Sequence, residues 1–437
     1  MKHRPQKPGI AKPAREALVA IEKPIYGGAF LARIEGKATF VPMTLPGEEA
    51  RVRIVDEKKS FATAEPDEIV SASAERVVPN CRHFGSCGGC QYQHATYEAQ
   101  LTYKQAILRE TLERGSVRVP ETIEALAGNP WQYRNRIRLA IDDVGRVGYR
   151  ARRSHALVPI AECPIAAPLL VKAALSAAEL LREAKAEMRP MEMSLFANAE
   201  ETELLASFFV HGSSEQGFNR FYDEWKKRIP SLVGAEVIEE RGDALAPRVL
   251  MRMGHGSLLY RVGKLQYRVD HGAFFQVNRW LNDALVDRVA GGRHGRLAWD
   301  LFAGVGLFAK RLAEGFEQVV AVESAPMASE ALKHNVDGSA AECLIADTAA
   351  FLRVHGKTAS PDVVVVDPPR AGLGAETTSL LAAVKPPVIV YVSCDPATLA
   401  RDLRALVESG YALSSLTLAD LFPQTFHLES VVELRRS

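Results

Sequence analysis

Cys394 lies between an apolar run and a predicted helix. The run from Val388 to Ser393 is rich in β-branched residues and predicts a buried strand. Asp395 and Pro396 then suit an N-cap and a first helical position. A cysteine at the positive end of a helix dipole is expected to favour the thiolate, its reactive form. Most free cysteines are small buried apolar residues, but ligands of α/β folds bind at strand ends, so the position predicts a nucleophile.

A glycine-rich turn follows a second predicted strand. Asp300 is followed by Gly304 and Gly306, and the turn matches the GxGxx[GA] pattern, which alone is also found in NAD-binding folds. Glu323 ends the next predicted strand, where an acid bonds the ribose hydroxyls of an adenosine-containing cofactor. Asp347 follows a further short strand and is expected to meet the adenine amino group.

Asp367 follows the apolar run Val363 to Val366 and precedes Pro368, Pro369 and Arg370. A buried parallel strand therefore delivers an acid to a rigid turn, an element for which NAD dehydrogenases have no use. Methyltransferases that use S-adenosylmethionine place such a motif beside the acceptor base. Together with DLFAGVG, it predicts an α/β class I S-adenosylmethionine methyltransferase domain of the Rossmann-like type.

Two further segments hold candidate site residues. Phe274, Phe275, Gln276 and Asn278 precede a predicted helix at 279–290, and they suit either a core and cap or contact with a base. Glu429 precedes the last predicted strand, where a reversed strand would bring it beside Cys394; a solvated acid is the alternative.

Four cysteines suggest a metal centre. Cys81, Cys87 and Cys90 have C-x5-C-x2-C spacing, and Cys163 is followed by a proline, as is frequent at iron–sulfur ligands. Four thiolates suit a 4Fe–4S cluster or an all-cysteine zinc site. A single CxxC pair favours the cluster over a zinc ribbon, and unligated cysteines are the remaining alternative. A cluster with four protein ligands would be structural.

Residues 16–76 alternate short apolar segments with glycine turns, which predicts an OB-type β-barrel, a fold that binds single-stranded nucleic acid. The segment resembles the TRAM domain, a small RNA-binding barrel. Seven arginines within residues 134–153 alternate along predicted strands. We interpret them as RNA contacts rather than a solvated face. The candidate RNA-binding residues are Arg134, Arg136, Arg150, Arg152, Arg153 and Phe274.

The charge distribution agrees with a polyanionic partner. Residues 1–160 carry 25 Lys and Arg against 18 Asp and Glu, whereas residues 161–437 carry 29 against 35. No apolar run is long enough to span a membrane, and the first residues lack a secretory signal. We expect a cytoplasmic protein, a monomer, with a disordered basic tail at residues 1–15.

The motifs FFQVN, DLFAGVG, DPPRAGL, SCDPATLARDL and HLES, in this order, resemble the uridine-5 RNA methyltransferases. The cysteine pattern and the barrel resemble their 23S ribosomal RNA branch. The resemblance implies Cys394 as nucleophile, Glu429 as base and the four cysteines as 4Fe–4S ligands. It places Gln276, Phe302, Glu323 and Asp367 around S-adenosylmethionine, together with the glycines of the DLFAGVG turn.

Two positions depart from that family. Leu307 stands where an asparagine is frequent, which removes a polar cofactor contact, and Gln424 stands where a histidine is common, which puts a proton relay there in doubt. Other possibilities are a tRNA uridine-5 methyltransferase, an RNA cytosine-5 methyltransferase and a non-catalytic RNA-binding assembly factor. The cytosine enzymes usually carry a Pro-Cys after the acidic strand, and none follows Asp367.

The expected organisation has three folded parts. A TRAM-like barrel spans 16–76, a β-rich iron–sulfur and RNA-binding domain spans 77–96 and 129–270, and the methyltransferase domain spans 97–128 and 271–437.

Overall fold

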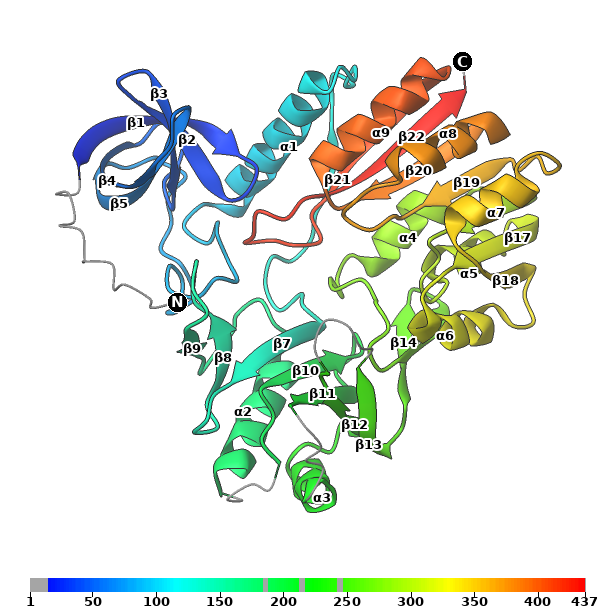
Figure 1. The fold of residues 1–437 in the computed structure, drawn as a ribbon, viewed down its shortest axis with the longest axis horizontal. Coiled ribbons are helices and arrows are strands. Elements are labelled where there is room, and N and C mark those ends of the chain that lie inside the picture. Colours follow the sequence, from blue (N-terminus) through cyan, green and yellow to red (C-terminus); the bar gives the residue numbers. More distant parts are fainter. Residues whose placement is uncertain (1–14, 184–187, 212–216, 242–246, 437) are drawn as a thin grey trace, which may run out of the picture.

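The computed structural model describes residues 15–183, 188–211, 217–241 and 247–436. Figure 1 shows three lobes, with the barrel in blue, a β-rich lobe in green and the larger α/β lobe in yellow to red. The tail predicted at residues 1–15 lies outside the described residues, except for Arg15. No helix in the described ranges is long and apolar enough to cross a membrane.

The first lobe is a closed barrel, as the alternating apolar residues predict. Its strands pair in the order β1-β2-β3-β5-β4. Alternate side chains such as Val19, Ile21, Val41 and Val52 point into its core. The strands are β1 (Glu16–Ile25), β2 (Ala29–Ile34), β3 (Lys37–Pro42), β4 (Glu49–Glu57) and β5 (Phe61–Ser71).

The central lobe is a sheet with the order β13-β12-β11-β10-β7-β8-β9. Two helices, α2 (Pro168–Glu183) and α3 (Phe218–Arg228), share one core with this sheet. The sequence pattern predicts a β-rich region from 190 to 270, and the described residues there form six strands together with α3, which the pattern did not single out. Aromatic residues suggest strands, but Phe218, Phe221, Tyr222 and Trp225 have helical spacing and are all buried. The strands are β7 (Arg136–Ile141), β8 (Val147–Arg150), β9 (Leu157–Pro159), β10 (Glu192–Ala197), β11 (Leu204–Val210), β12 (Leu232–Glu239) and β13 (Arg248–Gly254).

The third lobe is the predicted class I methyltransferase fold, with the sheet order β18-β17-β16-β19-β20-β22-β21-β6. The first five strands of this order are parallel, and β22 is antiparallel to both of its neighbours. The strands are β6 (Glu124–Leu126), β16 (Gly295–Leu301), β17 (Phe316–Glu323), β18 (Ala341–Ile345), β19 (Val363–Val366), β20 (Val388–Ser393), β21 (Tyr411–Ala419) and β22 (Glu429–Arg436).

Two hydrophobic cores cover the faces of this sheet. Helix α1 (Tyr97–Arg114) packs beside α9 (Pro396–Glu408), although nearly 300 residues separate them in the sequence. The hairpin of β14 (Ser257–Val262) and β15 (Leu265–Asp270) packs against α6 and contributes to the methyltransferase core, whereas the sequence pattern groups it with the central lobe. The remaining helices are α4 (Asn282–Ala290), α5 (Leu307–Leu312), α6 (Pro326–Val336), α7 (Thr348–His355) and α8 (Gly374–Val384).

Candidate active site

The predicted site residues gather where the parallel strands end. Strands β16, β17, β18, β19 and β20 run in one direction, so their carboxyl ends share one edge of the sheet. The glycine turn follows β16, Glu323 ends β17, Asp367 follows β19 and Cys394 follows β20. Strand β22 begins with Glu429 at the same edge, because Ser393 pairs with Ser430 in the antiparallel ladder.

Cys394 sits at the predicted strand-to-helix junction. Asp395 is the N-cap of α9, and its Oδ1 accepts hydrogen bonds from the backbone nitrogens of Ala397 and Thr398, both at 3.0 Å. The expectation that this position favours the thiolate is nevertheless wrong for this structure. Burial, followed by the charges of Glu429 and Asp367, raises the pKa of Cys394 to about 12. These effects outweigh Arg370, which acts in the opposite direction.

Two carboxylates beside Cys394 are also hard to ionise. Burial raises the pKa of Asp367 to about 7. The pKa of Glu429 is raised well above its ordinary value, first by burial and then by Asp367, while Arg370 lowers it. Because both side chains are buried and mutually repulsive, one of them can hold a proton at neutral pH and act as an acid or a base.

The glycine turn after β16 has the backbone conformation of a cofactor loop. Phe302, Gly304 and Gly306 all have positive φ values, of 66°, 55° and 86°. A Cβ on Gly304 would meet nothing within 4 Å, so this part of the turn borders open space. A Cβ on Gly306 would approach Leu332 Cδ1 at 2.8 Å, so close packing excludes a larger residue there.

Glu323 and Asp347 lie next to this turn. Glu323 Oε2 accepts a hydrogen bond from the Gly304 nitrogen at 2.7 Å, which joins the ends of β16 and β17. Asp347 is the N-cap of α7, and its Oδ1 accepts from the Ala350 nitrogen at 3.0 Å. Glu323 Oε1 also accepts from the nitrogens of Ser324 and Ala325, at 2.8 and 2.6 Å, so three backbone donors hold this carboxylate and leave it one acceptor site.

Gln276 connects the segment before α4 to the sheet edge that carries Glu323, Asp367, Cys394 and Glu429, which we call the catalytic edge. Its side-chain Nε2 donates to Asp367 Oδ2 at 3.4 Å, and its backbone carbonyl oxygen accepts from Asn135 Nδ2 at 2.9 Å. Phe275 is buried, whereas Phe274 is 63 % exposed. Phe274 is therefore free to stack on a base, while its neighbour belongs to the core.

The four cysteines of the predicted metal centre line one pocket. It is bounded by Cys81, Cys87, Cys90 and Cys163, with Arg134 and Tyr149. Burial, with charge repulsion between the thiols, raises the pKa of Cys81 and Cys87, and that of Cys90 to about 12. Among the described residues, no group of three or more potential ligands is arranged to hold a single metal ion.

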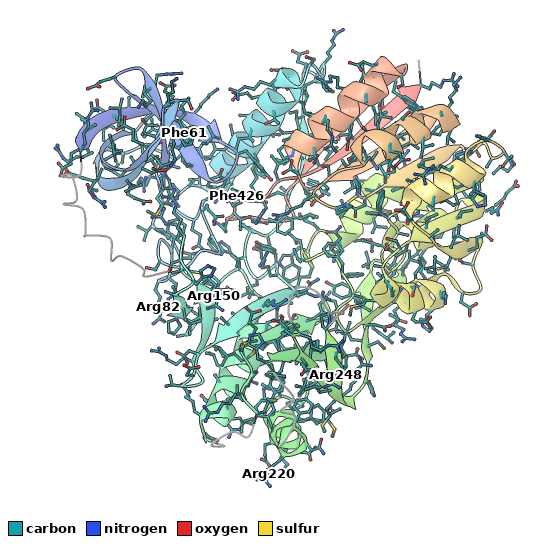
Figure 2. The ribbon with its side chains drawn as sticks, viewed as in Figure 1. Phe61, Arg82, Arg150, Arg220, Arg248 and Phe426 are labelled. Atoms are coloured by element: carbon teal, nitrogen blue, oxygen red, sulfur yellow. The ribbon has the colours of Figure 1, made fainter. Side chains whose placement is uncertain are left out.

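The predicted RNA-binding arginines have different surroundings. Arg152 and Arg153 both form ion pairs with Glu65 of β5, the latter at 3.0 Å, so they join the central lobe to the barrel. Arg150 Nη1 donates to the carbonyl of His155 at 2.9 Å, and its side chain lies on the part of the central lobe that faces the barrel (Figure 2). Arg134 lies between the cysteine pocket and a larger cavity that Arg136 also lines.

Residues that sequence reasoning did not single out also reach the site. Tyr26, in the turn after β1, donates a hydrogen bond to Asp395 Oδ2 at 3.3 Å and packs edge-on against Phe426. Figure 2 shows Phe426 where the lobes meet. Arg370 is the cation nearest to Cys394 and Glu429, and its Nη2 lies 3.3 Å from His427 Nδ1. The DPPR motif contains Arg370, but no sequence signal brings residue 26 to residue 395.

The two departures from the family pattern are accommodated by packing. Leu307 is buried in the core beneath the turn. Gln424 exchanges two hydrogen bonds with Gln100 of α1, at 2.9 and 3.0 Å, and its carbonyl accepts from the nitrogens of Gln91 and Tyr92. An amide pair thus fixes the loop before Glu429, and position 424 offers no group that titrates.

Comparisons with known proteins agree with this geometry. Residues 256–437 match the family model described as tRNA (Uracil-5-)-methyltransferase, and residues 12–66 match the TRAM domain. The 23S rRNA (uracil(1939)-C(5))-methyltransferase RlmD of Halomonas elongata is 33 % identical over 428 residues, 94 % of this chain and 87 % of that protein. The RlmD of Shewanella denitrificans is 32 % identical over 440 residues and covers 92 % of each chain.

A solved structure has the same architecture. The Pyrococcus abyssi tRNA (uracil-54, C5)-methyltransferase, in complex with S-adenosyl-L-homocysteine, superimposes with a TM-score of 0.77 at 27 % identity, covering 96 % of this chain and all of that one. A match of this extent includes the barrel, so the barrel alone does not separate ribosomal RNA enzymes from tRNA enzymes. The sequence relationship over nearly the whole chain and the catalytic edge together show that the protein belongs to the S-adenosylmethionine-dependent RNA uracil-5 methyltransferases.

Proposed function

We propose that the protein methylates C5 of a uridine in 23S ribosomal RNA, with Cys394 as the nucleophile and Glu429 as the base. The observation that carries this proposal is the convergence of Cys394, Glu429 and Asp367 at one strand edge, where Asp367 raises the pKa of Glu429 and both carboxylates raise the pKa of Cys394. The ribosomal target is supported by the names of the RlmD relatives.

The chemistry requires a nucleophile and a base on the same base ring. Uracil C5 is a weak nucleophile, and S-adenosylmethionine supplies an electrophilic methyl group. After losing its proton, the Cys394 sulfur bonds to C6, and the electron pair of the C5–C6 bond becomes available at C5. C5 would then bond to the methyl carbon as the bond between that carbon and the cofactor sulfur breaks, which releases S-adenosylhomocysteine. Glu429 then removes the C5 proton, the C5–C6 double bond re-forms, and the carbon–sulfur bond to Cys394 breaks.

Other residues of the site would hold the reactants. Gln276, Phe302, Glu323 and Asp367 are proposed to border S-adenosylmethionine, with Gly304, Gly306 and Asp347 around its adenosine part. The open space above Gly304 and the free acceptor capacity of Glu323 support this. A flipped uridine would stack on exposed Phe274. Cys394 must be deprotonated for addition, and a bound cation close to Asp367 would lower the pKa of Cys394.

Trapping of the covalent intermediate tests these roles. We expect Cys394→Ala to form neither an RNA adduct nor methylated RNA. Glu429→Gln should add and methylate but fail to remove the C5 proton, which leaves methylated RNA bonded to Cys394. Denaturing gels with labelled S-adenosylmethionine would show this complex in Glu429→Gln alone. Rapid turnover by Glu429→Gln without a complex would exclude Glu429 as the base.

A tRNA uridine is the second candidate substrate, because the Pyrococcus abyssi enzyme shares the architecture. Mass spectrometry of ribosomal RNA and tRNA from cells with and without the gene would decide between them. Loss of 5-methyluridine from tRNA alone would overturn the ribosomal assignment. Methylation of cytidine, or RNA binding without methyl transfer, would overturn the proposed reaction itself.

We further propose that Cys81, Cys87, Cys90 and Cys163 hold a structural 4Fe–4S cluster. The support is that all four cysteines line one pocket and that their spacing resembles the iron–sulfur ligands of the 23S ribosomal RNA branch. The segment after Cys90 packs on the loop before Glu429, so the cluster would keep this junction in place. Anaerobically purified protein should contain about four irons per chain. Stoichiometric zinc in colourless protein would contradict the assignment.

A further inference from the structure

We propose that the cavity on the open face of the central sheet binds a second nucleobase of the RNA substrate, close to the target uridine. Arg136 would donate hydrogen bonds to a base with two neighbouring acceptors, as guanine has at O6 and N7. This inference rests on the proposed RNA substrate and assigns the cavity a role distinct from that of the catalytic edge.

Arg136 is a partly buried cation without a counterion among the described residues. Its guanidinium lies 4.3 Å from the centre of the Phe196 ring, and its Nε is buried with no hydrogen-bond partner. No carboxylate in the described ranges pairs with it, and burial alone lowers its pKa to about 10. An ionised group is seldom left buried and unpaired, unless a partner arrives from outside.

Arg138, two residues along the same strand and on the same face, shows the contrast. It stacks 4.1 Å from the Phe209 ring, but its Nε also donates to Glu192 at 2.5 Å, and its Nη2 donates to Glu240 at 3.0 Å. The same side-chain type on the same surface is therefore neutralised at one position and not at the other.

The walls of the cavity suit a flat aromatic ring. The cavity has a volume of about 500 Å³, and its walls include Phe196, Leu205, Phe209, Ile238 and Met327, the hydroxyl groups of Ser194 and Ser207, and the charged side chains of Arg134, Arg138 and Asp270. Arg138 and Asp270 already have partners of opposite charge, Glu192 and Arg268. A phosphate beside the apolar part of the walls would lose its hydration, whereas a base would bury its faces there. One face of the guanidinium covers Phe196, so its N–H edge remains available for a base edge.

The cavity and the catalytic edge share one segment of the chain. His271, Gly272 and Val277 line the cavity, while Gln276 contacts Asp367 at the catalytic edge. A row of aromatic rings continues this connection. The ring of Phe196 lies parallel to that of Tyr260, with 5.9 Å between their centres, and the centres of the Tyr260 and Phe275 rings are 4.5 Å apart. An RNA strand that passes over exposed Phe274 would therefore place one base in the cavity and the target uridine beside Cys394.

Abasic scanning tests the proposal. The probes are RNA oligonucleotides that contain the methylated uridine with one abasic position near it, and their Kd values are measured for three proteins. One position besides the target should cost the wild type about tenfold or more in affinity, as loss of a bidentate base contact does. Arg136→Met keeps the packing on Phe196 without the donors, so the same abasic position should cost it less than twofold. Arg138→Met is the matched control and should keep the wild-type penalty.

Each other outcome is informative. If Arg136→Met weakens every oligonucleotide equally and lowers the salt slope by about one, Arg136 contacts a phosphate and the proposal is wrong. The absence of any sensitive position in the wild type would also overturn it. If Arg136→Met unfolds, Arg136→Lys provides the second test, on the condition that its thermal stability equals that of the wild type. If the sensitive position is present but wild-type protein methylates no uridine, the proposed function fails and the base site stands.

Discussion

Two sets of buried carboxylates lie in the methyltransferase domain, and they differ in their partners. Asp420, beside α1, bonds Lys104 Nζ at 2.6 Å, and both side chains are at most 1 % exposed. Asp402 accepts from the Tyr391 hydroxyl at 2.8 Å and from Arg401 Nε at 2.9 Å. At the catalytic edge, in contrast, Asp367 receives one long contact from Gln276, and its pKa is raised to about 7.

The difference indicates which charges serve the fold and which serve the reaction. A buried charge costs several kcal/mol unless it is paired, so the structural carboxylates have donors. In the proposed reaction, the partners of the carboxylates at the catalytic edge are the reactants, a sulfonium cation and a base that loses a proton. Arg136 shows the same situation with opposite sign in the central cavity.

Removal of a structural partner should have the largest effect on stability. Lys104→Met leaves Asp420 buried without its cation, and we expect the free energy of unfolding to fall by about 3–5 kcal/mol. Urea unfolding measures this loss. Lys333→Met, which removes an exposed lysine paired with Glu330 at 3.1 Å, is the matched control and should change stability by about 0.5 kcal/mol or less. A loss below about 1 kcal/mol for Lys104→Met would show that the pair is not essential.

Asp367→Asn should act in the opposite direction. The unfolded carboxyl titrates near about 3.9, whereas the folded one titrates near 7, so the folded state holds the proton more tightly. Stability from this group is present at low pH and decreases as pH rises from about 4 to 7, by up to about 1.4 kcal/mol per pH unit. The asparagine variant should lose this dependence and gain stability over the wild type at pH 8, while methyl transfer is lost.

Unfolding free energies of both proteins at several pH values give the difference curve, from which groups that do not interact with Asp367 cancel. Glu429 does not cancel, because the charge of Asp367 raises its pKa and the variant removes that charge. Parallel curves would mean that the pKa of Asp367 is the same in the folded and unfolded states.

The smallest effect on stability is expected for ion pairs that are partly exposed to solvent. Glu65→Ala removes the acid that pairs with Arg152 and Arg153, and it should cost less than about 1 kcal/mol. It should also free two arginines for phosphate contact, so RNA binding should tighten and its salt dependence should become steeper. Titrations of RNA at several salt concentrations measure both. Unchanged binding would show that these arginines join the lobes and do not contact RNA.

Local patterns were sufficient for much of this structure. The strand before Cys394, the N-cap Asp395 and the glycine turn have short-range signals, and the alternation in residues 16–76 predicts the barrel. What failed depends on distant residues. The thiolate preference at Cys394 was expected from the helix dipole, but two carboxylates from other strands and burial reverse it. Helix α3 was not singled out within the β-rich region, although the spacing of its aromatic residues is helical.

The contacts between distant segments had no sequence signal at all. Tyr26 reaches Asp395, and Gln100 pairs with Gln424, because the tertiary structure brings them together. The RNA-binding interpretation of the arginines was likewise made from composition. Composition does not show that Arg152 and Arg153 share Glu65 or that Arg136 has no carboxylate partner among the described residues.

The packing of α1 on the loop before Glu429 also constrains how the chain folds. Lys104 and Asp420 are 316 residues apart in sequence, and the whole central lobe lies between them. During synthesis, α1 and β6 emerge long before β21 and β22. The apolar surfaces of α1 and β6 therefore remain exposed until β21 and β22 are made. Folding of the central lobe shortens the effective loop between these parts and so reduces the entropy lost when they meet. The rate at which the catalytic edge forms should therefore depend on a lobe that contributes no strand to it.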